Sequence, residues 1–168
     1  MAQATTKDWL DGIQKGLLKQ LTENRGALPK GFNQDRFILN SITVIRDMLR
    51  DNKKKKQLQE IDYTSIPICL AKGAFLGLDF FNGECYAIPY GGEMKFQTDY
   101  KGEIKLCKRY SKNEIKDIFA KVVREGDFFE ESVDSGVQNV VYKPLPFSNK
   151  PLVGAFAIVV FKDGSMLY

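Results

Sequence analysis

The sequence predicts an α+β protein, with N-terminal helices followed by a β-hairpin, a basic helix and a mostly antiparallel sheet. In the first half of the chain, apolar residues recur every three or four positions, which is typical of helices packed on a core. Beyond Gly77 the period changes, and several segments are typical of strands, with turns supplied by Gly91-Gly92 and Asp163-Gly164. Helices followed by meandering strands are typical of the α+β class.

Two helices are expected before Asp51. Thr6 or Asp8 can cap the first, which ends near Asn24-Arg25-Gly26 because a glycine permits a left-handed C-cap. Its apolar stripe consists of Leu10, Ile13, Leu17 and Leu21. After a breaker segment, residues 27–31, a second helix runs from about Asn33 to Leu49. The apolar face of this second helix consists of Phe37, Ile38, Val44, Ile45, Met48 and Leu49.

The four lysines Lys53–Lys56 come next, and two interpretations of them stay open. In the first they form a solvated loop between helices; in the second they contact phosphates, although a flexible loop positions such contacts poorly. A short helix then begins at Ser65 and ends at Leu76-Gly77. It tolerates Pro67 because the N–H groups of a first turn have no partner within the helix.

Strands dominate the rest of the chain. Segments Cys85–Tyr90 and Met94–Thr98 form a hairpin joined by Gly91-Gly92-Glu93. Pro89 cannot donate to a β-ladder, so we expect it at a sheet edge or a bulge. The further strand candidates are Phe119–Arg124, Asn139–Tyr142 and Val153–Phe161, and the turn Asp163-Gly164 begins one more.

Composition argues against several classes of function. The 168 residues include no histidine, so the commonest general base and metal ligand are missing. No G-x-x-x-x-G-K-[ST] loop indicates ATP use, and we expect no cofactor, no metal and no catalytic residue. The cysteines Cys69, Cys85 and Cys107 are widely spaced among apolar residues, and we expect three buried, inert thiols.

Neither a membrane segment nor a secretion signal is apparent. No apolar run approaches the roughly 20 residues that span a bilayer, and the first residues lack the basic-then-apolar pattern of a signal peptide. We therefore expect a cytoplasmic protein.

The positive charge is concentrated in one part of the chain. The net charge is +4, and the segment from Met94 to Arg124 holds nine Lys or Arg against four Asp or Glu, so the remainder sums to −1. Within it, Tyr100–Lys112 is expected to form a helix with a nearly pure cationic ridge on one face. The buried side of that helix would consist of Ile104, Leu106, Cys107 and Tyr110. A row of cations binds a phosphate backbone by releasing counterions, although a solvated face is the alternative interpretation.

Aromatic residues accompany the basic segment. Tyr86, Tyr90, Phe96 and Tyr100 lie in or beside the hairpin, and single-strand binders stack bases on such rings. Phe96 and Tyr86 are equally compatible with a place in the core. The candidate DNA-binding residues are Lys95, Gln97, Tyr100, Lys101, Lys105, Lys108, Arg109, Lys112 and Arg124.

An ordered set of short motifs resembles the RecT family of phage single-strand DNA annealing proteins. The motifs are Leu76-Gly77-Leu78-Asp79, Gly83, Tyr86-Ala87-Ile88-Pro89-Tyr90-Gly91, Gln97, Tyr100-Lys101-Gly102, Ile104, Leu106, Arg109, Ser111 and Val122-Val123-Arg124-Glu125-Gly126-Asp127-Phe128. The resemblance runs from about Leu28 to the end of the chain and is strongest between Leu76 and Phe129. Gln97, Tyr100, Lys101 and Arg109 lie on the family pattern, whereas the other candidates rest on charge and spacing alone.

The resemblance implies a function and partners. RecT-like proteins are non-catalytic, bind single-stranded DNA and the annealed duplex in a basic groove, and form rings or helical filaments. They act beside a phage exonuclease, and contact with a host single-strand binding protein is expected of them. Residues 1–27 would then be a helical oligomerisation segment and residues 28–168 the DNA-binding core. Family members continue beyond the position equivalent to Tyr168, so the core is expected to be truncated at its C-terminus.

Two interpretations from other classes stay open. A structural or assembly protein could use the basic ridge to bind an acidic protein partner. A nucleic-acid enzyme would need carboxylates for magnesium, and Glu125, Asp127, Glu130 and Glu131 are such a cluster in the sequence. We interpret that cluster as a solvated turn after a strand, because nothing nearby supplies a base or a completing ligand.

Overall fold

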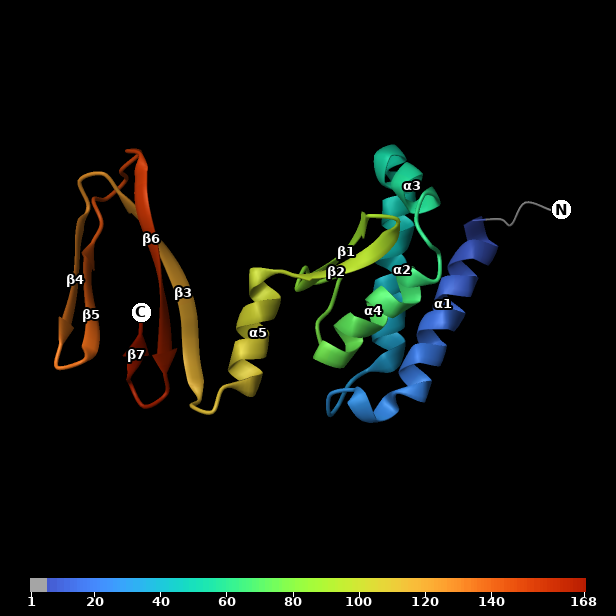
Figure 1. Ribbon diagram of the computed structural model, residues 1–168, viewed down its shortest axis with the longest axis horizontal. Helices are drawn as coiled ribbons and strands as arrows, with labels where there is room; N and C mark the ends of the chain where they lie inside the picture. The colour runs from blue at the N-terminus through green and yellow to red at the C-terminus, as the bar shows by residue number, and fades with distance from the viewer. Residues whose placement is uncertain (1–5) are drawn as a thin grey trace. The chain divides into compact units, whose positions relative to one another are not determined.

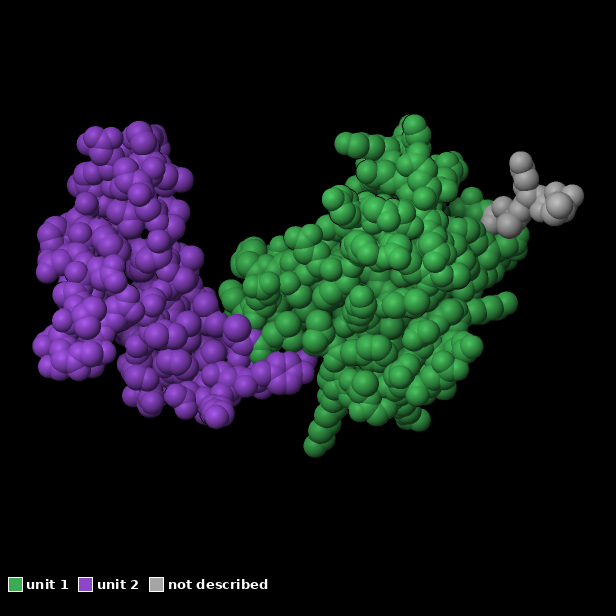
Figure 2. All heavy atoms as spheres, viewed as in Figure 1, with its two compact units in different colours: residues 1–106 green, residues 107–168 purple. Residues whose placement is uncertain are grey.

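The computed structural model describes residues 6–168 and divides the chain into two compact units, Met1–Leu106 and Cys107–Tyr168 (Figure 2). Five α-helices and seven strands, all paired antiparallel, make up the described part, which confirms the α+β class (Figure 1). None of the described helices has the length and apolar character needed to cross a membrane.

The first helix, α1 (Thr6–Glu23), buries the predicted stripe of Leu10, Ile13, Leu17 and Leu21. It already includes Thr6 and Asp8, so neither is its N-cap, and the position before Thr6 lies outside the described residues. The predicted left-handed cap at Gly26 is wrong. The chain instead tightens into a short 3-10 helix, Arg25–Ala27, in which the Ala27 N–H donates to the Asn24 carbonyl at 2.9 Å.

The second helix, α2 (Gln34–Arg50), is capped by Asn33, whose side chain accepts a hydrogen bond from the Arg36 N–H at 2.9 Å. Its buried face matches the predicted one at Phe37, Ile38, Ile45 and Met48. Ser41 and Ile42 are buried with them, and Val44 and Leu49 pack against the core from partly buried positions.

Lys53–Lys56 do not form a loop but lie on a third helix, α3 (Asn52–Gln59). Asp51 caps it by accepting hydrogen bonds from the N–H groups of Lys53 at 2.9 Å and Lys54 at 3.0 Å. The hydrogen bond from Lys54 is the main reason that the pKa of Asp51 is lowered. Leu58 is 4% exposed and anchors the other end to the core. A cap and one buried leucine therefore outweigh the mutual repulsion of the lysines.

The fourth helix, α4 (Ser65–Leu76), begins and ends where the sequence predicts. Gly77 takes the left-handed conformation at φ 62°, and the Leu78 N–H donates to the Gly73 carbonyl at 2.8 Å, which closes the helix end. The helices α1, α2 and α4 share one hydrophobic core with Leu78, Phe80 and Cys85. The segment 1–27 is therefore packed on the core of its unit from Leu10 to Leu21.

A β-hairpin lies on this helical layer. Strands β1 (Cys85–Tyr90) and β2 (Glu93–Thr98) pair antiparallel, with Tyr90 opposite Glu93. Gly91 and Gly92 both have positive φ angles, 59° and 78°, as a two-residue type I′ turn requires. Pro89 lies opposite Met94, whose N–H donates outward to the Ser65 hydroxyl at 2.8 Å. That pair exchanges no ladder bond, so the predicted edge position of Pro89 is confirmed.

Unit 2 is built of strands. The sheet order is β3-β6-β7, with β3 at Ile115–Arg124, β6 at Leu152–Phe161 and β7 at Met166–Leu167. A second hairpin pairs β4 (Phe128–Asp134) with β5 (Val137–Lys143). The strands predicted at β3, β5 and β6 are confirmed with longer bounds, whereas β4 was not predicted. Val123 is the one buried residue of this unit, all of which is described.

The cysteines fall into two groups. Cys69 and Cys85 are buried as predicted, and burial raises the pKa of each thiol to about 12. Cys107 is exposed, so the prediction of a buried thiol is wrong there.

Candidate nucleic-acid interface

The outward face of the β1–β2 hairpin carries aromatic and polar side chains. Along β1 the buried residues Cys85 and Ala87 alternate with the exposed residues Tyr86, Ile88 and Tyr90. Their cross-strand partners on the same face are Gln97, Lys95 and Glu93. The strand period of two therefore brings Tyr86 beside Gln97 and Ile88 beside Lys95 on one solvent-facing surface.

Exposure separates the rings that could stack on bases from those of the core. Tyr90 is 74% exposed, Tyr100 66% and Tyr86 45%, so all three present ring surface to solvent. Phe96 packs edge-on against Phe80, with ring centroids 6.1 Å apart. The alternatives that stayed open are thus resolved: Tyr86 lies on the surface, and Phe96 packs against the core from a partly buried position.

Asp99 ties the hairpin to the start of α5 (Tyr100–Tyr110). Its carboxylate accepts a hydrogen bond from the Tyr86 hydroxyl and one from the Lys101 N–H, each at 3.1 Å. The hydrogen bond to Asp99, and the charge of that carboxylate, raise the pKa of Tyr86. The phenol therefore stays protonated at neutral pH, and its ring is held next to the first turn of α5.

Gly102 permits α5 to approach the hairpin closely. It is the buried residue of α5, and a Cβ built on it would overlap the carbonyl oxygen of Glu84. The same carbonyl accepts the Asp99 N–H at 3.0 Å. Glycine is thus required by a backbone-to-backbone contact rather than by an unusual φ angle. This contact determines where Tyr100 and Lys101 lie.

The buried side of α5 differs from the predicted one. Ile104 and Leu106 are half-buried, but Cys107 is exposed and Tyr110 is 66% exposed. The helix docks through Gly102, so its core-facing side is rotated away from Cys107. It ends at Tyr110, and Lys112 lies in the bend that follows instead of on the helix.

In unit 1, two of the predicted cations pair with carboxylates. Lys95 Nζ lies 2.5 Å from Glu93 Oε2 in an exposed pair, and Lys105 Nζ lies 2.7 Å from Glu84 Oε2. Glu84 is only 17% exposed and also accepts the Asp79 N–H at 2.9 Å, which makes this pair the firmer one. Lys101 forms no ion pair within the described residues, and its ammonium group lies 5.9 Å from the centroid of the Tyr100 ring.

The remaining predicted cations lie in unit 2. Lys108 pairs with Asp117 at 3.4 Å, and the Arg124 guanidinium donates to the Lys150 carbonyl at 2.7 Å. Arg109 lies 6.0 Å from the centroid of the Tyr110 ring. The prediction of a nearly pure cationic ridge is therefore wrong, because carboxylates distant in sequence neutralise part of it. Exposed pairs contribute only about 0–1 kcal/mol, so Lys95 and Lys108 can exchange a carboxylate for a phosphate.

The carboxylate cluster of Glu125, Asp127, Glu130 and Glu131 is not a single turn. Glu130 and Glu131 lie on β4, where successive side chains point to opposite faces. Asp127 accepts hydrogen bonds from the N–H groups of Leu145 and Arg124, each at 2.9 Å, and these lower its pKa. Among residues 6–168, no group of three or more carboxylate or cysteine side chains is arranged to hold a metal ion.

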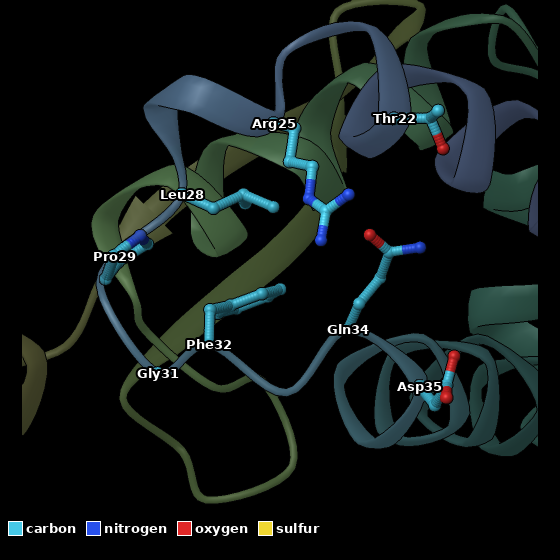
Figure 3. Close-up of a pocket in the computed structure, with 8 residues that line it drawn as sticks. All are labelled: Thr22, Arg25, Leu28, Pro29, Gly31, Phe32, Gln34 and Asp35. Carbon is cyan, nitrogen blue, oxygen red and sulfur yellow. The ribbon is translucent and has the colours of Figure 1, made fainter.

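One cavity was not foreseen from the sequence. It has a volume of about 490 Å³ and lies between the end of α1 and the start of α2 (Figure 3). Its lining combines the apolar Leu28, Pro29 and Phe32 with Arg25 and Gln34, whose side chains point toward one another. The sequence indicated only a breaker segment here.

The comparison with protein families gives a match over most of the chain. The family model described as RecT family matches residues 35–168, which include the hairpin, α5 and all of unit 2. No curated protein matches the chain.

Proposed function

The chain belongs to the RecT family, whose proteins anneal single strands in DNA recombination, and on that premise we propose that it binds and anneals single-stranded DNA without a nucleotide cofactor. The observation that carries the proposal is the surface of unit 1, where Tyr86, Tyr90 and Tyr100 are exposed and Lys101 forms no ion pair with any residue from 6 to 168. Stacking rings beside a cation is the combination that binds single strands of any sequence.

Each residue of this surface has a distinct role in the proposal. Lys101, with Lys95, contacts phosphates, and Lys105 contributes once its pair with Glu84 opens. Tyr100 stacks on a base, and Gln97 on the hairpin face donates to the sugar–phosphate backbone. None of these contacts reads a base edge, so the edges stay available to a complementary strand. Discrimination between strands then comes from base pairing rather than from the protein.

Unit 2 supplies a second set of candidate contacts, namely Lys108, Arg109, Lys112 and Arg124. We propose that these cations hold further phosphates of bound DNA. Family membership implies self-association, and the segment 1–27 is the proposed oligomerisation element of a ring or filament. A phage exonuclease and a host single-strand binding protein are the proposed partners, in the cytoplasm of a bacterial host.

The paired lysines favour one competing function. Since Glu93, Glu84 and Asp117 already bind three of the cations, an acidic protein surface could replace these carboxylates in an assembly protein. That alternative predicts saturable binding to a protein and no dependence of affinity on the length of an oligonucleotide.

Replacing Lys101 with alanine is expected to weaken binding to oligonucleotides of every sequence. The loss of one phosphate contact should flatten the plot of log affinity against log salt concentration by about 0.7. The measurement is fluorescence anisotropy of a labelled oligo-dT at several salt concentrations. Lys72→Ala, which removes an exposed lysine from α4, should leave the slope unchanged. Equal slopes for the wild type, Lys101→Ala and Arg109→Ala would remove both cations from the site.

A further inference from the structure

A groove, separate from the cavity between α1 and α2, lies along the free edge of β1. It has a volume of about 300 Å³, at the lower end of the range for ligand pockets. Its apolar floor contains Val44, Met48 and Phe80. One wall is formed by five consecutive residues, 85–89, with no residue of β2, and the opposite wall is formed by Lys54 and Gln57 of α3.

The β1 wall presents backbone hydrogen-bonding groups. Pairs of an antiparallel ladder alternate between those that exchange hydrogen bonds and those that do not. The Met94 N–H points outward to Ser65, so the pair Pro89–Met94 exchanges no hydrogen bonds. The same holds for the pair Ala87–Phe96, which lies two residues further along the ladder. The N–H and C=O of Ala87 and the C=O of Pro89 therefore point away from β2, toward the side where the groove lies. A donor and two acceptors are thus available there.

Of the four lysines on α3, only Lys54 lines the groove. Lys54 and Gln57 are three residues apart and share the side that faces the groove. Lys56, two residues from Lys54, lies roughly 200° around the helix and is not part of the lining. The cap at Asp51 uses the backbone N–H of Lys54 and leaves its ammonium group available.

We propose that this groove binds one nucleotide of a single DNA strand, which makes α3 part of the DNA-binding surface. The base lies on the apolar floor with its edge toward the backbone of Ala87, and Lys54 contacts the adjoining phosphate. The groove meets the outward hairpin face at Tyr86 and Ile88, which line it, so a strand on that face can continue into it. The inference rests on the proposed binding of single-stranded DNA.

The observations favour a nucleotide over a peptide strand added to β1. A peptide would pair with successive N–H groups along the edge, but Pro89 has none, and only five residues line the groove. Lys54 on the facing wall matches a phosphate instead.

Lys54→Ala and Lys56→Ala form a matched pair of variants, since each removes one exposed lysine from the same helix. Anisotropy with labelled oligo-dT should show Lys54→Ala binding about fivefold more weakly at 0.1 M salt, which corresponds to one phosphate contact. Lys56→Ala should bind like the wild type. Hydrogen exchange of the Ala87 amide should slow when oligo-dT is added to the wild type, because the base covers that N–H.

The outcomes separate this inference from the proposed function. Suppose that the wild type binds oligo-dT and that Lys101→Ala weakens this binding. If Lys54→Ala and Lys56→Ala then have the same affinity for oligo-dT, and the exchange rate of the Ala87 amide does not change, the groove is not a nucleotide site. A change in self-association of Lys54→Ala without a change in DNA affinity would overturn the inference in favour of a protein strand. A wild type that binds no oligonucleotide would overturn both proposals.

Discussion

Replacing Tyr100 with alanine is expected to weaken binding to single-stranded DNA by about 5- to 140-fold. The ring is 66% exposed at the start of α5, next to the hairpin face. Stacking of one base on an aromatic side chain contributes about 1–3 kcal/mol, and this range converts to the stated loss of affinity. Equilibrium titration with labelled oligo-dT measures it.

Two control variants separate stacking from other causes. Tyr100→Phe keeps the ring and should retain nearly all of the affinity, which excludes a role that depends on the hydroxyl. Phe147→Ala removes a fully exposed aromatic side chain from a loop of unit 2 and should bind like the wild type. If Tyr100→Ala and Phe147→Ala both bind as the wild type does, stacking at Tyr100 is excluded.

Gly102→Ala is expected to destabilise unit 1 by about 1–3 kcal/mol, the usual range for overpacking. Its Cβ would overlap the Glu84 carbonyl oxygen, a backbone atom that cannot move aside as a flexible side chain could. The shift would also disturb the hydrogen bond from the Asp99 N–H to that carbonyl. Urea unfolding monitored by circular dichroism gives the change in the free energy of unfolding. Affinity for oligo-dT should fall with it, because Tyr100 and Lys101 move with α5.

Gly26→Ala is the matched control for that substitution. Gly26 lies in the short 3-10 helix with a negative φ, and a Cβ there would meet no atom within 4 Å. Its stability should therefore equal or slightly exceed that of the wild type, since alanine restricts the unfolded chain. An unchanged free energy of unfolding for Gly102→Ala would show that α5 does not depend on this close approach.

The elements with strong local patterns were predictable from the sequence. The stripe from Leu10 to Leu21 predicts α1, and the adjacent glycines at 91 and 92 predict the hairpin. Glu93, which was expected in the turn, instead begins β2 opposite Tyr90. In contrast, β4 mixes acidic residues with Phe128 and Phe129 and stays largely exposed, so no alternation of buried and exposed residues marks it. A run of four lysines favours a solvated loop, whereas Lys53–Lys56 form a helix because Asp51 caps it.

The candidate site was predictable only in part, because its charges depend on tertiary contacts. Helical spacing places Lys101 and Lys105 on one face of α5, but Glu84, which binds Lys105, lies 21 residues earlier in the chain. The strand period places Tyr86 on the opposite face from Cys85 and Ala87, but it does not say which face is buried. The structure shows that Cys85 and Ala87 are buried, so Tyr86 is exposed. The groove between β1 and α3 joins residues from separate elements, so no local motif indicates it.

The most direct test of the central claim is strand annealing in the absence of any nucleotide. Two complementary oligonucleotides, one with a fluorophore and one with a quencher, are mixed in EDTA with increasing amounts of the protein. We predict that the wild type accelerates quenching and that Tyr100→Ala does so much less. A folded wild-type protein that leaves the spontaneous annealing rate unchanged at every concentration would contradict the account.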